Sequence, residues 1–180
     1  MNFFAKNTSY RVGQGCGLDA CPYVVERLAD GSLSYRELAV SAFRLGRYSR
    51  LSRRINRLAA RVGGFCFRSE PHQARWTDQA EPRASPRWMA AVYLLSAREA
   101  LWERVKSALS PRNIQWGSVT LGSLDPQSYA LYKAAKGIWS GALDIHPLEL
   151  EDPDLIHDDT LLLIVNGVLL ARYGRAVLGG

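Results

Sequence analysis

Apolar residues recur at helical spacing from residue 88 to residue 109. This spacing predicts one long helix, or two short helices with a bend near Ser96. The apolar positions that repeat in this way are Trp88, Ala91, Val92, Leu95, Trp102, Val105 and Leu109. A strand is expected over residues 114–121, although two glycines weaken the pattern there.

Two further helices are expected closer to the C-terminus. Asp125 followed by Pro126 is typical of a helix start, and the helix that it opens extends to about Trp139. The pair Asp152–Pro153 repeats this signal. The apolar segment 161–172 then predicts a last helix, with acidic residues at its start.

Closer to the N-terminus, a polar and basic stretch carries a different helical pattern. Ser34 and Glu37 have the spacing of a capping box, which predicts a helix from Tyr35 to Phe43. A second helix is expected over residues 47–62, where two glycines end it. Its apolar positions step by three and four residues: Tyr48, Leu51, Ile55, Leu58 and Val62. Two helices around a short turn indicate a helix-turn-helix-like unit.

These patterns predict a mainly α-helical fold. A basic helical unit over residues 1–67 is expected to connect, through a proline-containing linker over residues 68–87, to a compact helical module over residues 88–180. In that module we expect Trp102 and Trp139 to be buried together with Leu163.

Composition and charge support this division. The chain has 180 residues, 47% of them apolar, which is enough to form a core and excludes disorder throughout. Residues 1–68 hold 12 Lys or Arg against 4 Asp or Glu, whereas the remainder holds 11 against 13. The basic part is therefore the candidate for contact with an anionic partner.

The cysteines and the apolar segments bear on localisation. Three cysteines are too few for a disulfide scaffold of this length, so a reducing cytoplasm is expected. The N-terminus lacks the apolar core of a signal peptide. The segment 161–171, interrupted by Asn166, is too short to span a bilayer and predicts a buried helix without membrane contact.

The strongest chemical signal is a row of arginines in the second helix. Their steps of three and four residues follow the apolar positions with an offset of one residue, so they are expected to form one exposed stripe. The stripe consists of Arg47, Arg50, Arg54, Arg57 and Arg61, and Arg44 and Arg53 extend it. Guanidinium groups bind phosphate oxygens bidentately and also suit an acidic protein surface. An ordinary solvated helix face is the alternative.

Residues 49–58, with the sequence SRLSRRINRL, resemble the recognition helix of bacterial winged-helix regulators, and residues 35–39 resemble the helix before it. The resemblance covers about thirty residues and implies a DNA-reading role for Ser49, Arg50, Arg53 and Arg54. The gap between the two helices is longer than in that family. No wing follows Gly64.

Three stretches within residues 88–174 resemble a family of small uncharacterised helical proteins from Gram-positive bacteria and their mobile elements. They are residues 92–102, 130–139 and 165–174. The resemblance implies a helical fold and a mobile-element setting. It assigns no catalytic residue.

Other chemistry has weaker support in the sequence. Cys16, Cys21, Cys66 and His72 are candidate zinc ligands, but their spacing is loose, and buried cysteines with a surface histidine explain them more simply. The acidic run from His146 to Asp159 has donors for a divalent metal, yet a solvated loop with helix caps accounts for it. No catalytic constellation is recognisable, so neither enzymatic activity nor a cofactor is expected.

The sequence therefore favours a non-enzymatic nucleic-acid-binding accessory or regulatory protein that uses an arginine-rich helix. The alternative is a mobile-element or phage protein that binds a protein partner, such as an inhibitor of a host defence system. Both hypotheses use the same arginines.

Overall fold

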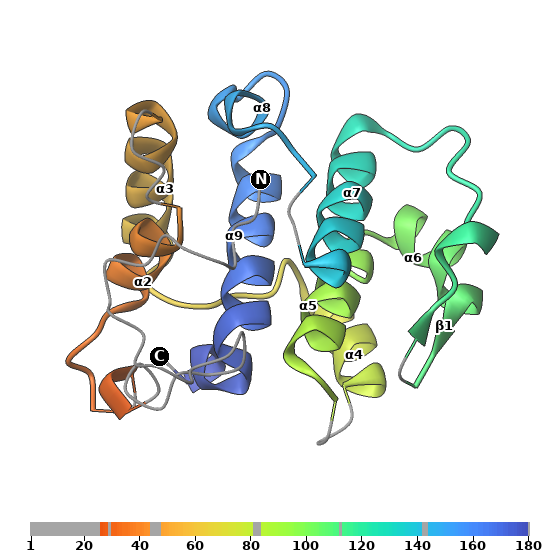
Figure 1. Cartoon of the computed structure of the whole chain (residues 1–180), viewed down its shortest axis with the longest axis horizontal. Coiled ribbons are helices and arrows are strands. Elements are labelled where there is room, and N and C mark those ends of the chain that lie inside the picture. Colours follow the sequence, from red (N-terminus) through yellow and green to blue (C-terminus); the bar gives the residue numbers. More distant parts are fainter. Residues whose placement is uncertain are drawn as a thin grey trace.

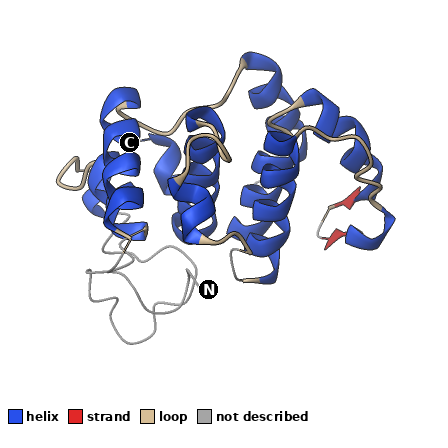
Figure 2. Ribbon diagram, turned by 90° about the horizontal axis from the view of Figure 1, so that it is seen from above, coloured by secondary structure: helices blue, strands red, loops and turns tan. Residues whose placement is uncertain are grey.

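The computed structural model of the chain describes residues 26–28, 30–43, 48–80, 84–111, 113–141 and 144–179. Within these ranges the protein is mainly α-helical, as predicted, and Figure 2 shows its two short strands at the periphery. The α-helices are α2 (Tyr35–Ala42), α3 (Ser49–Val62), α4 (Glu70–Gln79), α5 (Pro86–Leu95), α6 (Glu99–Val105), α7 (Pro126–Ser140), α8 (Pro147–Glu151) and α9 (Asp158–Tyr173). The strands β1 (Leu109–Ser110) and β2 (Asn113–Ile114) pair antiparallel, and the 3₁₀ turns are η1 (Lys106–Ala108), η2 (Trp116–Ser118) and η3 (Gly174–Gly179).

Helices α5, α7 and α9 form the centre of the molecule (Figure 1). In α5, every residue from Trp88 to Leu95 is buried, and α9 is buried along nearly all of its length. The two helices approach closely at Gly167, where an added Cβ would lie 2.9 Å from the side chain of Leu94. Glycine at this position therefore allows the two central helices to pack directly on each other.

The remaining helices cover this centre on several sides. Helices α2 and α3 pack on α9, α4 packs on α5, and α6 with the β1–β2 pair lies at the opposite end of the molecule (Figure 1). A single hydrophobic core includes residues from α2 and α3 as well as from α5, α7 and α9. The basic unit and the helical module predicted from the sequence thus share one core.

A buried polar network connects α2 to the central helices. The hydroxyl of Tyr35 donates to Oδ1 of Asn166 over 2.6 Å, and Nδ2 of Asn166 donates to the hydroxyl of Tyr93 over 3.1 Å. Both Asn166 Nδ2 and the Tyr93 hydroxyl also donate to the carbonyl oxygen of Cys66. These hydrogen bonds satisfy the polar residue that interrupts the apolar sequence of α9.

Several local predictions are confirmed. Ser34 Oγ accepts from the backbone N–H of Glu37, and the Glu37 carboxylate accepts from the N–H of Ser34, which completes the capping box. Gly63 ends α3 with a left-handed φ of 72°. The predicted bend near Ser96 is the break between α5 and α6. Leu163 is buried, with 3% of its surface exposed.

The prediction of a linker over residues 68–87 is wrong. Residues 70–79 form α4, and Trp76 is buried with its indole N–H donating to the carbonyl oxygen of Met89 over 2.9 Å. Two of the three prolines that suggested a linker occupy first-turn positions instead, Pro71 in α4 and Pro86 in α5, and the third, Pro82, lies outside the described residues. Proline is well tolerated there because these N–H groups have no partner within the helix.

Three further expectations need correction. The strand predicted over residues 114–121 is reduced to the pair Asn113–Ile114. Asp152 does not start a helix. It follows the end of α8, which begins at Pro147. Trp102 and Trp139 are half-buried at the edge of the core, since each lies on the outer side of its helix.

The segment Asp158–Gly179 is long and apolar enough to cross a membrane by length and composition alone. In the fold, 78% of its apolar window is buried inside the protein. Its composition therefore fits the buried helix expected from the sequence.

Candidate nucleic-acid interface

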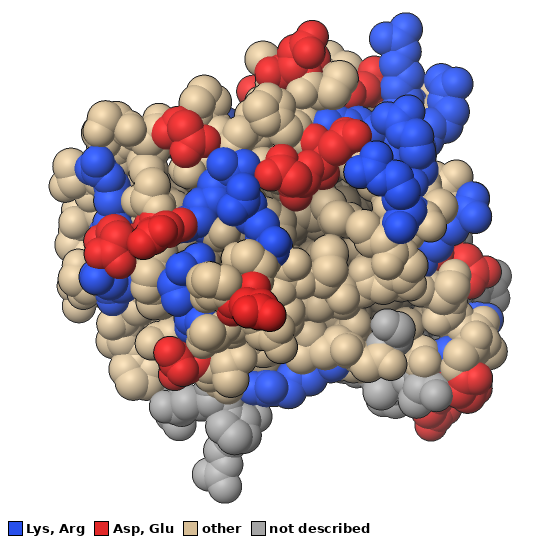
Figure 3. All heavy atoms as spheres, turned by 180° about the vertical axis from the view of Figure 1, so that it is seen from behind, with Lys and Arg blue, Asp and Glu red and all other residues tan. Residues whose placement is uncertain are grey.

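Helix α3 lies at one edge of the molecule, and its outer side presents a row of basic side chains. Figure 3 shows a dense group of Lys and Arg atoms over this edge. The exposed arginines of α3 are Arg50, Arg53, Arg57 and Arg61, and we call them the arginine face. Leu51, Ile55 and Leu58 on the opposite side are almost fully buried, so the orientation of the helix is fixed by its core contacts.

Most of the arginine face is not neutralised by carboxylates. Within the described ranges, Arg57 and Arg61 form no hydrogen bond or ion pair, and Arg53 only donates to the carbonyl oxygen of Ser49 over 3.4 Å. Arg50 lies 3.9 Å from a carboxylate oxygen of Glu151. Three guanidinium groups on one side of a helix are therefore available to an anionic partner.

The expectation that Arg54 is exposed with the others is wrong. Arg54 is 5% exposed, and its Nη2 and Nε donate to Oδ1 of Asp158 over 2.7 and 2.9 Å. Its Nη1 donates to the carbonyl oxygen of Leu150 over 2.8 Å, and Nη2 also donates to that of Ile156. The side chain therefore binds α3 to α8 and to the start of α9.

The helical geometry explains this correction. An offset of one residue corresponds to a rotation of about 100° around the helix, so the predicted stripe flanks the buried side instead of opposing it. Where a neighbouring element lies on that flank, a stripe residue becomes buried, and α8 lies beside α3 at Arg54. Arg53 lies on the side opposite the buried Leu51, Ile55 and Leu58 and is exposed.

Two predicted residues of this region, Arg44 and Arg47, lie outside the described residues, and one arginine that was not predicted lies beside the arginine face. On α2, the sequence analysis missed Arg36, which is exposed and donates from Nε to Oδ1 of Asn56 on α3 over 2.7 Å. Its place in the first turn of a capped helix, beside the buried Tyr35, was the available signal. Arg36 adds a cation beside the arginine face.

The candidate zinc ligands are not assembled in the part of the chain that the structure describes. Cys16 and Cys21 lie outside the described residues, and the described ranges contain no cluster of three potential metal ligands. Nδ1 of His72 accepts from the N–H of Arg68 over 3.0 Å, and Nε2 lies 2.8 Å from the carbonyl oxygen of Tyr93. Both ring nitrogens are therefore occupied. The thiol of Cys66 instead lies next to Asn166.

The acidic run before and within α9 has structural roles. His146 and Glu149 form a capping box at the start of α8. Asp158 binds Arg54, and Asp159 pairs with Arg98 over 3.1 Å. Three carboxylates of the run thus have partners within the protein.

No family model, curated protein or solved structure matches this chain. The two resemblances drawn from the sequence therefore stay predictions, and the candidate interface depends on its own geometry.

We expect Arg54→Ala to destabilise the protein by roughly 3 kcal/mol, because two carbonyl oxygens and a carboxylate lose a buried donor. Arg53→Ala is the matched control, since it removes a neighbouring exposed arginine and should change stability by at most about 0.5 kcal/mol. Chemical denaturation measures both values. Equal stability of the two variants would show that the buried contacts of Arg54 contribute little.

We expect stability to fall as pH is lowered from 6.5 towards 4. Burial lowers the pKa of His72 from 6.5 to about 4. A second proton on the His72 ring would have to bind Nδ1, which accepts a hydrogen bond from the backbone N–H of Arg68, and this hydrogen bond would be lost. The unfolded chain then binds more protons in this range, so protonation favours unfolding as the pH decreases. An NMR titration of the His72 ring tests this, and a pKa near 6.5 in the folded protein would contradict it.

Proposed function

We propose that this protein is a non-enzymatic nucleic-acid-binding protein that contacts the phosphates of a duplex through Arg53, Arg57 and Arg61 of the arginine face of α3. The observation that supports this most strongly is the set of unneutralised guanidinium groups of Arg53, Arg57 and Arg61 on one exposed side of a helix. The helix that carries them is fixed by the core and by the buried Arg54, so binding orders the arginine side chains but requires no rearrangement of the backbone.

The spacing of these arginines suits a polyanion. Residues four apart in a helix are about 6 Å apart along its axis, so each long side chain reaches a different phosphate. Like charges at this spacing destabilise an isolated helix by about 0.2–0.5 kcal/mol per pair. Bound phosphates offset this repulsion, whereas solvent leaves it in place.

A duplex is favoured over a single strand. Proteins that bind single strands stack the bases on exposed aromatic rings. Along α3, from Ser49 to Val62, there is no aromatic residue, and Tyr48 before it is half-buried against the ring of His146. The arginine face therefore offers contacts to phosphates and has no aromatic ring for base stacking.

In the finer form of this proposal, α2 and α3 act as a helix-turn-helix with α3 in the major groove, in a cytoplasmic accessory or regulatory protein. The packing of α2 on α3 (Figure 1) and the exposed arginines on the other side of α3 favour this arrangement.

A protein partner with an acidic surface is the second candidate. The observation that favours it is within the chain itself, because carboxylates of Asp158 and Glu151 already contact arginines of α3. Such a partner would suit a mobile-element or phage protein that inhibits a host defence system. Binding assays with duplex DNA, duplex RNA and acidic proteins separate the two candidates.

If Arg53, Arg57 and Arg61 each neutralise one phosphate, log K for duplex DNA should fall with log salt at a slope of about −2.7. Affinity would then decrease about 40-fold between 50 and 200 mM salt. Arg53→Ala combined with Arg57→Ala should make the slope shallower by about 1.8 without unfolding the protein, since both side chains are exposed.

The matched control for this pair is Lys106→Ala combined with Lys136→Ala. It removes the same charge from exposed positions outside α3 and should leave the slope unchanged. Equal effects of the two double variants, or no binding of any duplex by the wild-type protein, would overturn the proposal.

A further inference from the structure

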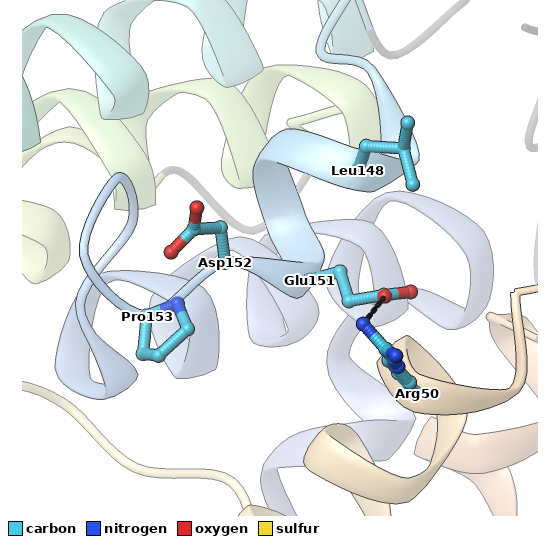
Figure 4. A pocket seen from close by; sticks show the side chains of 5 residues that line it. All are labelled: Arg50, Leu148, Glu151, Asp152 and Pro153. Atoms are coloured by element: carbon cyan, nitrogen blue, oxygen red, sulfur yellow. Dashed lines mark ion pairs between the residues drawn. The ribbon is translucent and has the colours of Figure 1, made fainter.

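A cleft of about 410 Å³ separates the start of α3 from α8. The residues that line it are Arg50, Leu148, Glu151, Asp152 and Pro153. Figure 4 shows the Glu151 carboxylate directed across the cleft at the guanidinium of Arg50. The Asp152 carboxylate points away from this guanidinium. The cleft thus places one acidic side chain at the first residue of the arginine face.

The backbone that carries Glu151 is fixed in this position. Arg54 donates to the carbonyl oxygen of Leu150, the residue before Glu151, and so fixes the end of α8 against α3. The Glu151 side chain is 16% exposed, whereas that of Arg50 is 79% exposed. Arg50 is the ion-pair partner of Glu151 within the described ranges, with 3.9 Å between the charged atoms.

We infer that Glu151 determines the footprint of the nucleic acid by excluding phosphates from Arg50. This inference rests on the proposed function. A duplex backbone then follows Arg53, Arg57 and Arg61, away from α8, and Arg50 contributes no phosphate contact. Glu151 is in this sense a specificity-determining residue that acts by repulsion.

Electrostatics supplies the reason. A phosphate bound by Arg50 would lie within a few ångströms of the Glu151 carboxylate, where like charges repel strongly because the carboxylate is mostly buried. Arg50 is also already paired with an anion in the free protein. A phosphate that replaced this anion would leave a buried carboxylate without its cation, which is unfavourable.

The test is Glu151→Gln, which keeps the size and helical propensity of the side chain and removes its charge. With Arg50 released, a fourth phosphate contact forms, and the loss of duplex affinity between 50 and 200 mM salt should rise from about 40-fold to about 150-fold. Arg50→Ala should leave the salt dependence of the wild-type protein unchanged. In the Glu151→Gln background the same substitution should abolish the gain.

Asp152→Asn is the matched control. It removes the same charge from the adjacent residue, and the asparagine keeps the oxygen that accepts from the N–H of Asp154 over 2.9 Å. Its salt dependence should equal that of the wild-type protein. An equal gain in salt dependence in both variants, or no gain in Glu151→Gln, would overturn the inference. The proposed function would stand in either case as long as the wild-type protein binds the duplex. Absence of wild-type binding would overturn both.

Discussion

The burial of α5 and α9 is the constraint on which the rest of the structure depends. Both helices are apolar on nearly every side, and such helices are stable in water only when other elements enclose them. The surrounding helices provide this enclosure, and α3 contributes Leu51, Ile55 and Leu58 to it. The exposure of the arginines on the other side of α3 follows from this packing.

Arg54 shows how the same guanidinium chemistry serves the fold. The last turn of α8 and the segment before α9 leave the carbonyl oxygens of Leu150 and Ile156 to be satisfied. Arg54 donates to both while it pairs with Asp158. Buried carbonyl groups without donors would be costly. Arg54 thus fixes the end of α8, and with it the position of Glu151 in the cleft.

Local features of this fold could be predicted from the sequence, and long-range contacts could not. The capping box of Ser34 and Glu37, the helix start at Asp125 and the stop at Gly63 each depend on a few neighbouring residues, and all three are present. The burial of Arg54 depends on backbone oxygens about one hundred residues away, which no helical spacing reveals. The linker prediction failed for a related reason. A proline such as Pro71 fits a linker and the first turn of a helix equally well, and only the burial of Trp76 in the fold distinguishes them.

The proposed function requires that Arg53, Arg57 and Arg61 contact the phosphates of a duplex. The most direct measurement is an NMR titration of the arginine Nε–H signals with duplex DNA at low salt. Phosphate contact should shift the signals of these three arginines and leave that of Arg54 unchanged, because its Nε–H already donates to Asp158. Shifts confined to arginines outside α3, such as Arg98 and Arg104, or unchanged signals from α3 while the duplex binds, would contradict this role.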